Sequence, residues 1–326
     1  MAQHFLLSAK ARTLSVVAVA RMTDDEARAT FRALRWASTD GEPVCPRCGC
    51  VAVYEYQTRR IFKCQGCGHQ FSITSGTIFA SRKLPVRDIL LAIALFVNAA
   101  KGISALQLGR DLDVQYKTAF VLSHKIREAM ALEHHDAILS GEVEVDGAYF
   151  GGYVRPENRK EDRKDRRLKE NQTGKRRVVV VMRQRGGRTL PFVFKSEDQS
   201  VPTIRERVAS GTTIYADEAP SWDDLHAAYD TRRINHSVAF MDEGVCTNQA
   251  ESYFSRLRRA EWGQHHHISG RYLYAYAGEM AWREDHRRVT NGEQFHAVIA
   301  ASMVHPVSRM WKGVLAAKRV NFRAER

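Results

Sequence analysis

Two Cys-x-x-Cys pairs separated by a short stretch constrain this chain more than any other feature of its sequence. They are Cys45-Pro-Arg-Cys48 and Cys64-Gln-Gly-Cys67. Zn²⁺ binds four thiolates tetrahedrally and each tight turn supplies two, so the spacing predicts a zinc ribbon over residues 43–80. The expected ligands of this structural ion are Cys45, Cys48, Cys64 and Cys67. Four cysteines used as small core residues, or in disulfides, are the alternative that fits the spacing less well.

The charge balance indicates a polyanionic partner. The 326 residues include 50 Lys and Arg against 37 Asp and Glu, a net charge of +13. This surplus alone leaves DNA, RNA and an anionic membrane surface open as partners. No apolar run reaches the roughly 18 residues of a membrane span, and we predict neither a span nor a signal peptide. Cys50 and Cys246 are expected to be free thiols in a reducing cytoplasm.

Helical patterns precede and follow the ribbon. Thr23-Asp24-Asp25-Glu26 is a capping-box sequence, which predicts a helix within a lead-in over residues 1–42. After the ribbon, apolar residues at helical spacing predict three helices, at Val86 to Ala99, Ser104 to Asp111 and Val114 to Leu132.

The joints between these three helices are short, as in a helix-turn-helix. Residues 81–135 are therefore predicted to form a helix-turn-helix-like DNA-binding region. The third helix carries Lys117, Lys125 and Arg127, which we expect to contact DNA. A helical linker without nucleic-acid contact is the alternative, since units of three helices are common packing devices.

Beyond residue 140 the predicted strands alternate with helices. Three strands, a helix, a strand, a helix, a strand and a long helix is the order of the RNase H-like α/β fold, a mixed sheet flanked by helices. We predict this core over residues 140–262 and a C-terminal helical region with a basic tail over 263–326. The strands are Glu142 to Asp146, Arg177 to Arg183, Leu190 to Lys195, Thr212 to Ala216 and Arg232 to Asn235; the helices are Val201 to Ser210, Trp222 to Tyr229, one from near Thr247, and His265 to Arg288.

A strongly basic insertion separates the first two predicted strands. Residues 155–177 contain 11 Lys and Arg against 5 Asp and Glu. Such a stretch buries too little apolar surface to order itself. It is predicted to be a flexible loop that grips phosphates, with a merely solvated loop as the alternative.

Three carboxylates fall on the elements that meet at the centre of such a sheet. Asp146 is expected to end the first strand, Asp217 follows a buried strand, and Glu251 lies on the first turn of the long helix. Carboxylate oxygens select Mg²⁺ or Mn²⁺, and a pair of such ions stabilises both oxygens of a phosphodiester displacement. Asn248 is one turn before Glu251, so either residue can be the third ligand. Arg258, two turns after Glu251, is expected to hold substrate phosphate.

Other polar and aromatic residues receive no catalytic role. His265, His266 and His267 are consecutive and cannot readily aim three imidazoles at one ion, so we interpret them as a turn or a DNA-contacting segment. Trp222, Tyr253 and Phe254 are expected in the core.

The combined motifs, from about Thr23 to Arg288, resemble those of the zinc-ribbon DDE transposases of bacterial insertion sequences. The resemblance rests on Cys45-Pro-Arg-Cys48, Cys64-Gln-Gly-Cys67-Gly-His-Gln-Phe71, Val145-Asp146-Gly-Ala-Tyr-Phe-Gly-Gly152, Ala216-Asp217-Glu218, and Thr247-Asn248-Gln-Ala-Glu251 with Arg258. Family members commonly carry His before the Thr-Asn pair and Lys seven residues after the acid, where this chain has Cys246 and Arg258. Some members are described by an Asn in the third catalytic place, which keeps Asn248 in contention.

The resemblance implies a mobile-element enzyme of DNA recombination. Its ribbon and helical region would bind the terminal inverted repeats, and its RNase H-like core would catalyse Mg²⁺-dependent cleavage and strand transfer. It supports Asp146, Asp217 and Glu251 as the acidic triad. The implied partners are double-stranded DNA, as element ends and as target, and further copies of the chain in a synaptic complex. The implied location is the nucleoid of the bacterial cytoplasm.

Two other functions fit the same residues. One is a DNA-binding regulator descended from such an enzyme and catalytically silent, in which Asp217→Asn changes nothing measurable. The other is an RNase H-like nuclease that hydrolyses DNA without strand transfer. Joined donor and target products separate the transposase from both.

Overall fold

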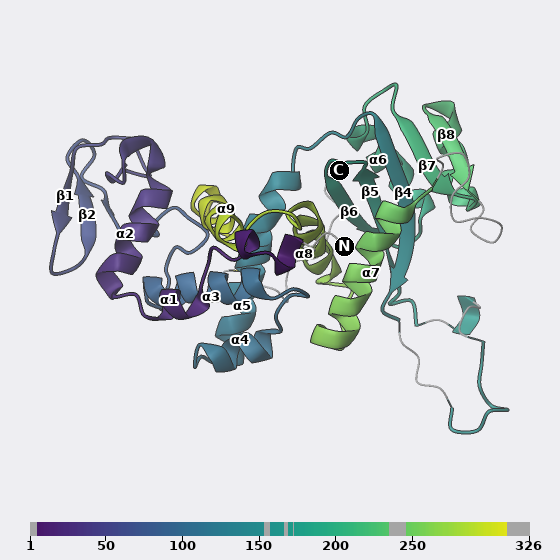
Figure 1. Cartoon of the computed structure of the whole chain (residues 1–326), viewed down its shortest axis with the longest axis horizontal. Coiled ribbons are helices and arrows are strands. Elements are labelled where there is room, and N and C mark those ends of the chain that lie inside the picture. The colour runs from purple at the N-terminus through teal and green to yellow at the C-terminus, as the bar shows by residue number, and fades with distance from the viewer. Residues whose placement is uncertain (1–4, 153–156, 166–168, 172, 235–245, 312–326) are drawn as a thin grey trace. The chain divides into compact units, whose positions relative to one another are not determined.

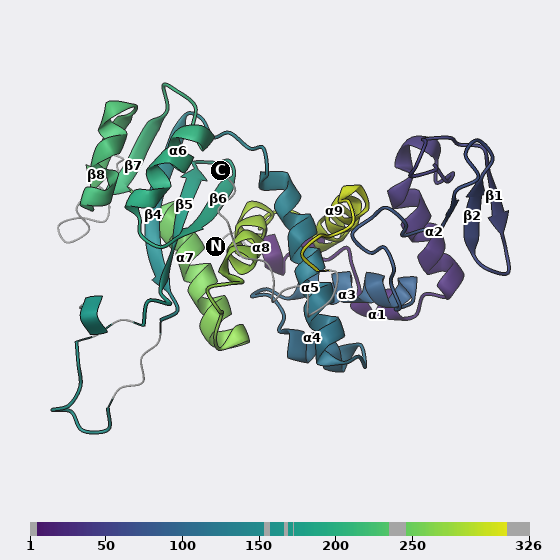
Figure 2. The same ribbon diagram turned by 180° about the vertical axis from the view of Figure 1, so that it is seen from behind.

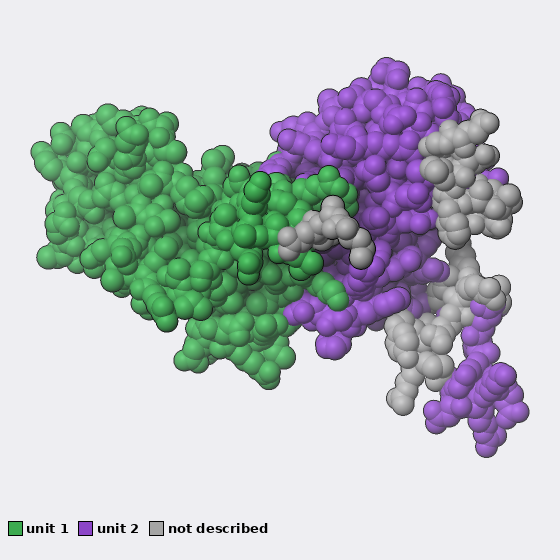
Figure 3. All heavy atoms as spheres, viewed as in Figure 1, with its two compact units in different colours: residues 1–132, 286–326 green, residues 133–285 purple. Residues whose placement is uncertain are grey.

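A computed structural model describes residues 5–152, 157–165, 169–171, 173–234 and 246–311 (Figure 1). The chain divides into two compact units, residues 1–132 with 286–326, and residues 133–285 (Figure 3). Within the described ranges, no helix is both long and apolar enough to cross a membrane. The predicted tail lies outside these ranges from residue 312 on.

The first unit begins with helices that lead into the ribbon. Helix α1 spans Val16–Ala20 and α2 spans Asp24–Arg35. The predicted capping box at the start of α2 is confirmed, because the Thr23 side chain accepts from the Glu26 N–H and the Glu26 carboxylate accepts from the Thr23 N–H. At the other end of α2, the Arg35 guanidinium donates to the carbonyls of three residues that follow the ribbon strands, Ser72, Ile73 and Ser75.

The ribbon is a three-stranded antiparallel sheet. Its strands are β1 (Val53–Tyr56), β2 (Ile61–Cys64) and β3 (Gln70–Phe71), in that order. Phe62 is fully buried between Trp36 and Phe71, with ring centroids 5.6 and 5.4 Å away. The strands bury Phe62, Phe71 and Cys64, and a ribbon of this size depends on further cross-links for stability.

The remaining helices of the first unit match the predicted ones to within two residues at each end. They are α3 (Val86–Asn98), α4 (Ala105–Asp111) and α5 (Tyr116–Met130). A further helix, α9 (Asn291–Val304), packs against α2, α3 and α5. The predicted C-terminal region 263–326 is thus shared between the units, since residues up to 285 belong to the second.

The second unit is built on a five-stranded sheet in the order β6-β5-β4-β7-β8. The strands β4, β5 and β6 form an antiparallel meander, and β7 and β8 continue the sheet parallel to β4. This mixed order confirms the predicted RNase H-like core. The bounds are β4 Glu142–Phe150, β5 Arg177–Gln184, β6 Thr189–Phe194, β7 Thr213–Asp217 and β8 Asp230–Ile234.

Helices cover both faces of this sheet. Helices α7 (Asn248–Ala260) and α8 (Leu273–Asp285) lie on one face, over Ala148 and Phe150 (Figure 1). On the other face, α6 (Val201–Arg207) and a 3₁₀ segment, η7 (Pro220–Ala227), pack on Val143 and Val145 (Figure 2). Alternate residues of β4 therefore serve two separate apolar clusters, which fixes the face to which each carboxylate of the strand points.

Four predicted elements differ from the observed ones. The helix predicted over Val201 to Ser210 ends at Arg207. Strand β4 does not end at Asp146 but continues to Phe150, because β5 pairs with β4 along its whole length whereas β7 pairs only up to Val145. The segment predicted as a helix from Trp222 is the 3₁₀ segment η7. The helix predicted from His265 begins only at Leu273, after a π-helical turn, η8 (Glu261–His265), and a positive φ of 58° at His266.

Candidate zinc ribbon and acidic active site

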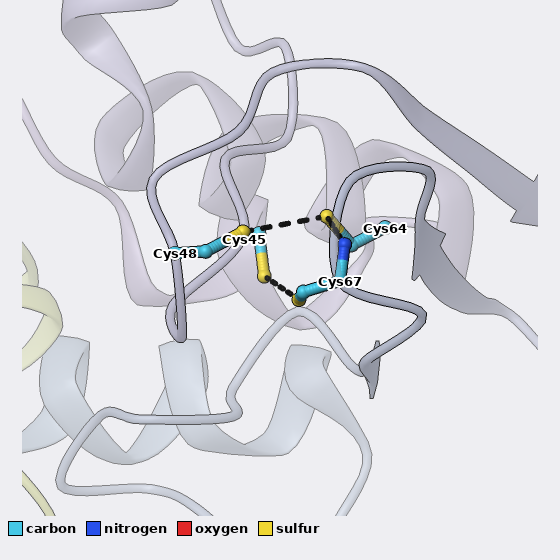
Figure 4. Close-up of side chains that lie close together, drawn as sticks. All are labelled: Cys45, Cys48, Cys64 and Cys67. Carbon is cyan, nitrogen blue, oxygen red and sulfur yellow. Dashed lines mark hydrogen bonds between the residues drawn. The ribbon is translucent and has the colours of Figure 1, made fainter.

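The four predicted zinc ligands converge at one point. The thiols of Cys45, Cys48, Cys64 and Cys67 come from two loops and point toward one another (Figure 4). All four sulfur atoms lie within 4.8 Å of one another, and within the described residues this is the one group of Cys, His, Asp or Glu side chains arranged to hold a metal ion. Four soft thiolates at this separation fit tetrahedral zinc.

The ribbon backbone favours the metal-binding form of one thiol. The N–H of Cys67 lies 3.4 Å from the sulfur of Cys64. This contact lowers the pKa of Cys64 to about 6, so that the thiolate is present at neutral pH. Cys50 lies beside the cluster, but its thiol is directed at the Ala52 carbonyl, 3.7 Å away.

Two of the predicted acids lie side by side in the second unit. Val145 of β4 pairs with Ala216 of β7, so Asp146 and Asp217 are the next residues of neighbouring strands. Both project from the face that α7 covers, because they alternate with residues of the opposite apolar cluster. Glu251 comes to this face from the first turn of α7, where its side chain and that of Asn248 are exposed.

Asp146 is the most perturbed of these acids. Burial raises the pKa of Asp146 to about 7, against the opposing effect of the Gly147 N–H, which donates to its carboxylate at 2.7 Å. The negative charges of Asp217 and Glu251 raise this pKa further. A divalent cation would relieve both effects, and carboxylate oxygens are the donors that Mg²⁺ and Mn²⁺ take, although the three acids do not converge to within 4.8 Å as the ribbon thiols do.

Asp217 is held by its neighbours rather than left to move. One of its carboxylate oxygens accepts from the buried Trp222 indole N–H at 2.7 Å and from the Ala219 N–H at 3.2 Å. Arg233 donates to the backbone carbonyl of Asp217 at 2.7 Å. Trp222 is in the core as predicted, together with Tyr253 and Phe254, but its polar end also orients a predicted catalytic acid.

A fourth carboxylate, that of Glu197, joins the cluster and escaped the sequence prediction. Its carboxylate lies over Gly147, where a Cβ on that residue would approach Glu197 Oε1 to 2.7 Å. Ser221 donates to Glu197 at 3.2 Å, and the charge of Glu197 also raises the pKa of Asp146. In the sequence, only the glycine next to Asp146 indicated a close neighbour at this point. Glu197 itself could not be identified, because it follows β6, which lies two strands away from β4 in the sheet.

Glu144 also escaped the prediction. It is fully buried on β4, on the same face as Asp146, and accepts hydrogen bonds from the first backbone N–H groups of α7. A charged residue inside a buried strand is unusual and was the available signal.

The predicted DNA contacts of the third helix divide by exposure. Lys117 is exposed at the start of α5, next to Tyr116, whose side chain is 54% exposed. Lys125 is half-buried, and burial lowers its pKa. Arg127 is only 2% exposed, with its guanidinium 5.2 Å from the centre of the Phe96 ring, so the prediction that it contacts DNA is wrong for this structure. Helical periodicity buries it among the residues that face the other helices.

The joint between α4 and α5 has the geometry of a helix-turn-helix. Asp113 in the turn has a positive φ of 51°. Gly109 of α4 allows the close approach of α5, since a Cβ there would lie 3.2 Å from the Val114 carbonyl and 3.5 Å from the Ala119 side chain. Residues 115–118, at the start of α5, are exposed.

The remaining predicted contact residues lie at the surface. Arg258 is exposed on α7, two turns beyond Glu251. The described side chains of residues 157–165 in the basic insertion are all exposed, and parts of that insertion lie outside the described ranges. His265 packs edge-on against the Tyr276 ring at 4.6 Å.

Comparison with known protein families agrees with both units. The family profile of the transposase zinc-ribbon domain matches residues 22–70, and that of the ISXO2-like transposase domain matches residues 138–285. The first match spans α2 and most of the ribbon, and the second spans the five-stranded sheet with α6, α7 and α8. No curated protein and no solved structure matches the chain.

Proposed function

Because this chain belongs to the zinc-ribbon DDE transposases of bacterial insertion sequences, we propose that it binds the inverted repeats of its own element and catalyses DNA cleavage and strand transfer there. The observation that carries the proposal is the adjacency of Asp146 and Asp217 beneath the start of α7, in a chain that also carries a four-thiol ribbon. Neither feature alone specifies a function, since both occur on unrelated proteins.

Asp146, Asp217 and one residue of α7 would hold the catalytic metal ions. The third ligand is Glu251 or Asn248, which share the first turn of the helix. Mg²⁺ or Mn²⁺ bound there would supply the charge neutralisation that phosphodiester displacement requires. Glu197 adds negative charge near Asp146 and would contribute to the attraction of a cation.

The other residues of the site orient the reactants. Trp222 and the Ala219 N–H fix the Asp217 carboxylate, which reduces the cost of ordering it when a metal binds. Arg258 is exposed and carries a planar guanidinium suited to bidentate contact with a phosphate. Positioning and charge neutralisation of this kind account for most of phosphoryl-transfer catalysis.

DNA binding is assigned to the first unit and to the insertion. Lys117 and the exposed start of α5 would enter the major groove, where recognition helices read base edges. The zinc-stabilised ribbon would add a second contact to the repeat. The net charge of +13 favours a long DNA contact, and two copies of the chain would pair two element ends in a synaptic complex.

The test is a cleavage and strand-transfer assay on DNA from the flanks of the gene. Wild-type protein with Mg²⁺ is expected to nick at the element boundary and to form joined products, and Asp217→Asn is expected to lose both while retaining DNA binding. Nicks without joined products would instead indicate a nuclease. Salt-sensitive binding with no metal-dependent product, in protein that retains its zinc, would indicate a silent regulator.

A further inference from the structure

Glu144 is a buried charge with no role in the chemistry proposed above. Its side chain has no solvent exposure, and it lies on β4 two residues before Asp146, on the face covered by α7. Burying a carboxylate is costly unless hydrogen bonds and an opposite charge compensate it. The hydrogen-bond partners of Glu144 therefore indicate the structural role of this buried carboxylate.

One oxygen of Glu144 binds the first turn of α7. Oε2 accepts from the backbone N–H of Gln249 at 2.8 Å and of Ala250 at 3.0 Å. The first N–H groups of a helix have no partner within the helix, and Thr247, which precedes α7, makes no side-chain cap. Glu144 supplies that cap from the neighbouring strand, and its negative charge complements the positive end of the helix dipole.

The other oxygen binds a cation that reaches the segment before α7. Arg185 donates through Nε to Glu144 Oε1 at 3.0 Å and through Nη2 to the Cys246 carbonyl at 3.0 Å. The Arg185 guanidinium also lies 3.9 Å from the centre of the Tyr215 ring on β7. Through these contacts Glu144 and Arg185 join β4 and β7 to the residues immediately before and after the start of α7.

We propose that Glu144 and Arg185 are positioning residues that set the first turn of α7 against Asp146 and Asp217. The metal ligand contributed by α7 lies within two residues of the amides that Glu144 binds, whether that ligand is Asn248 or Glu251. Asp146 is on the same strand as Glu144, so one carboxylate fixes the spacing between two ligands from different elements. The inference rests on the proposed function only for the identity of the metal site.

A matched control distinguishes positioning from simple stabilisation. Glu279 on α8 is likewise fully buried and pairs with Arg283 at 2.9 Å, but this ion pair is internal to α8. Glu279→Gln and Glu144→Gln therefore remove comparable buried charges from the same unit. In Glu144→Gln the carboxamide must direct its NH₂ group at either Arg185 or the helix amides, and both are donors.

The experiment measures Mn²⁺ binding to the zinc-loaded full chain by electron paramagnetic resonance, and hydrogen exchange of the peptide that contains residues 248–254. Glu144→Gln is expected to weaken Mn²⁺ binding by about 10–100-fold, as other outer-shell changes do, and to accelerate exchange at the start of α7. Glu279→Gln is expected to retain wild-type Mn²⁺ affinity even if it melts earlier. Equal Mn²⁺ affinity in wild type and Glu144→Gln, or equal losses in both variants, would overturn the proposal.

Arg185→Lys keeps the test decisive if Glu144→Gln does not fold. Lys retains the positive charge beside Glu144 but cannot also reach the Cys246 carbonyl in the same planar geometry. A weaker Mn²⁺ affinity with an unchanged melting temperature supports positioning, and unchanged Mn²⁺ affinity opposes it. If wild type cuts no DNA although these variants weaken Mn²⁺ binding, the proposed function fails while the positioning role stands.

Discussion

The two candidate metal sites of this chain are assembled in opposite ways. The four ribbon thiols come from two nearby loops and already converge to within 4.8 Å. The acids come from two strands and a helix of the second unit, and burial, together with the charges of the other two, raises the pKa of Asp146. The first site is a local cross-link in a small domain, whereas the second is assembled by distant elements of a large, well-packed scaffold.

This difference indicates which site the fold depends on. The three strands of the ribbon bury only Phe62, Cys64 and Phe71, so we expect zinc to supply much of the folding free energy of the ribbon. The five-stranded sheet has apolar clusters on both faces, so we expect it to stay folded without the metal. Removal of zinc should therefore unfold the ribbon, whereas removal of a divalent ion from the acids should leave the five-stranded sheet folded.

Loss of zinc should have the largest effect. Cys64→Ser is expected to unfold the ribbon, since structural zinc contributes about 10–16 kcal/mol in isolated zinc-binding domains. Hydrogen exchange should rise over residues 45–71 and stay unchanged over β4, β5 and β7, with loss of binding to the inverted repeat. Cys50→Ser, which alters a neighbouring thiol outside the cluster, is the control and should retain one zinc per chain. Full zinc content and repeat binding in Cys64→Ser would contradict the ribbon assignment.

Loss of the helix ligand should abolish chemistry and leave the fold intact. Glu251→Gln is expected to reduce the nicking rate by about 10³-fold or more, because such catalytic groups act as a unit. Repeat binding should be unchanged. Asn248→Ala is the matched change on the same turn. If Glu251→Gln retains the wild-type nicking rate and Asn248→Ala loses it, Asn248 is the third metal ligand.

The pH dependence of stability tests the burial of Asp146 among the other acids of the second site. The folded-state pKa of Asp146 is raised to about 7 from an ordinary value of 3.8, so the folded chain holds this proton more tightly than the unfolded chain. Without divalent metal, protonated Asp146 contributes its full stabilisation below pH 3.8. This contribution is lost as the pH rises to about 7. Asp146→Asn should remove that slope and stabilise the metal-free protein at pH 8 by about 2–4 kcal/mol.

Chemical denaturation at several pH values, without divalent metal and with the zinc retained, provides the measurement. Added Mg²⁺ should flatten the wild-type profile in the same way as the substitution, because it favours the ionised form. A wild-type profile that rises between pH 5 and 7, or an Asp146→Asn variant less stable than wild type at pH 8, would show that folding does not raise the pKa of Asp146.

The same contrast explains what the sequence could predict. The thiol spacing and the capping box at Thr23 are local patterns, and both identify their elements directly. The alternation of apolar and polar residues predicted the order of the strands. It did not predict the end of β4, because pairing with β5 extends this strand beyond Asp146. Glu144 and Glu197 escaped prediction because their partners lie on other elements, and no short motif marks such contacts.

Arg127 shows the limit of reading charge along a helix. Its sequence neighbours do not distinguish it from Lys117, yet one is 2% exposed on the Phe96 ring and the other lies at the surface. Only the packing of α5 against the other helices of the unit decides between a structural cation and a DNA contact.

The smallest predicted effect separates these two cations. Lys117→Ala is expected to weaken binding to the inverted repeat by about tenfold and to reduce the salt dependence by about one ion, with the melting temperature unchanged. Arg127→Ala is expected to lower the melting temperature, because it removes a buried side chain and its contact with Phe96. Titration of labelled repeat DNA at several salt concentrations, with a thermal melt of each variant, measures both. Unchanged salt dependence in Lys117→Ala would remove the start of α5 from the DNA contact and leave the ribbon and the insertion to bind the repeat.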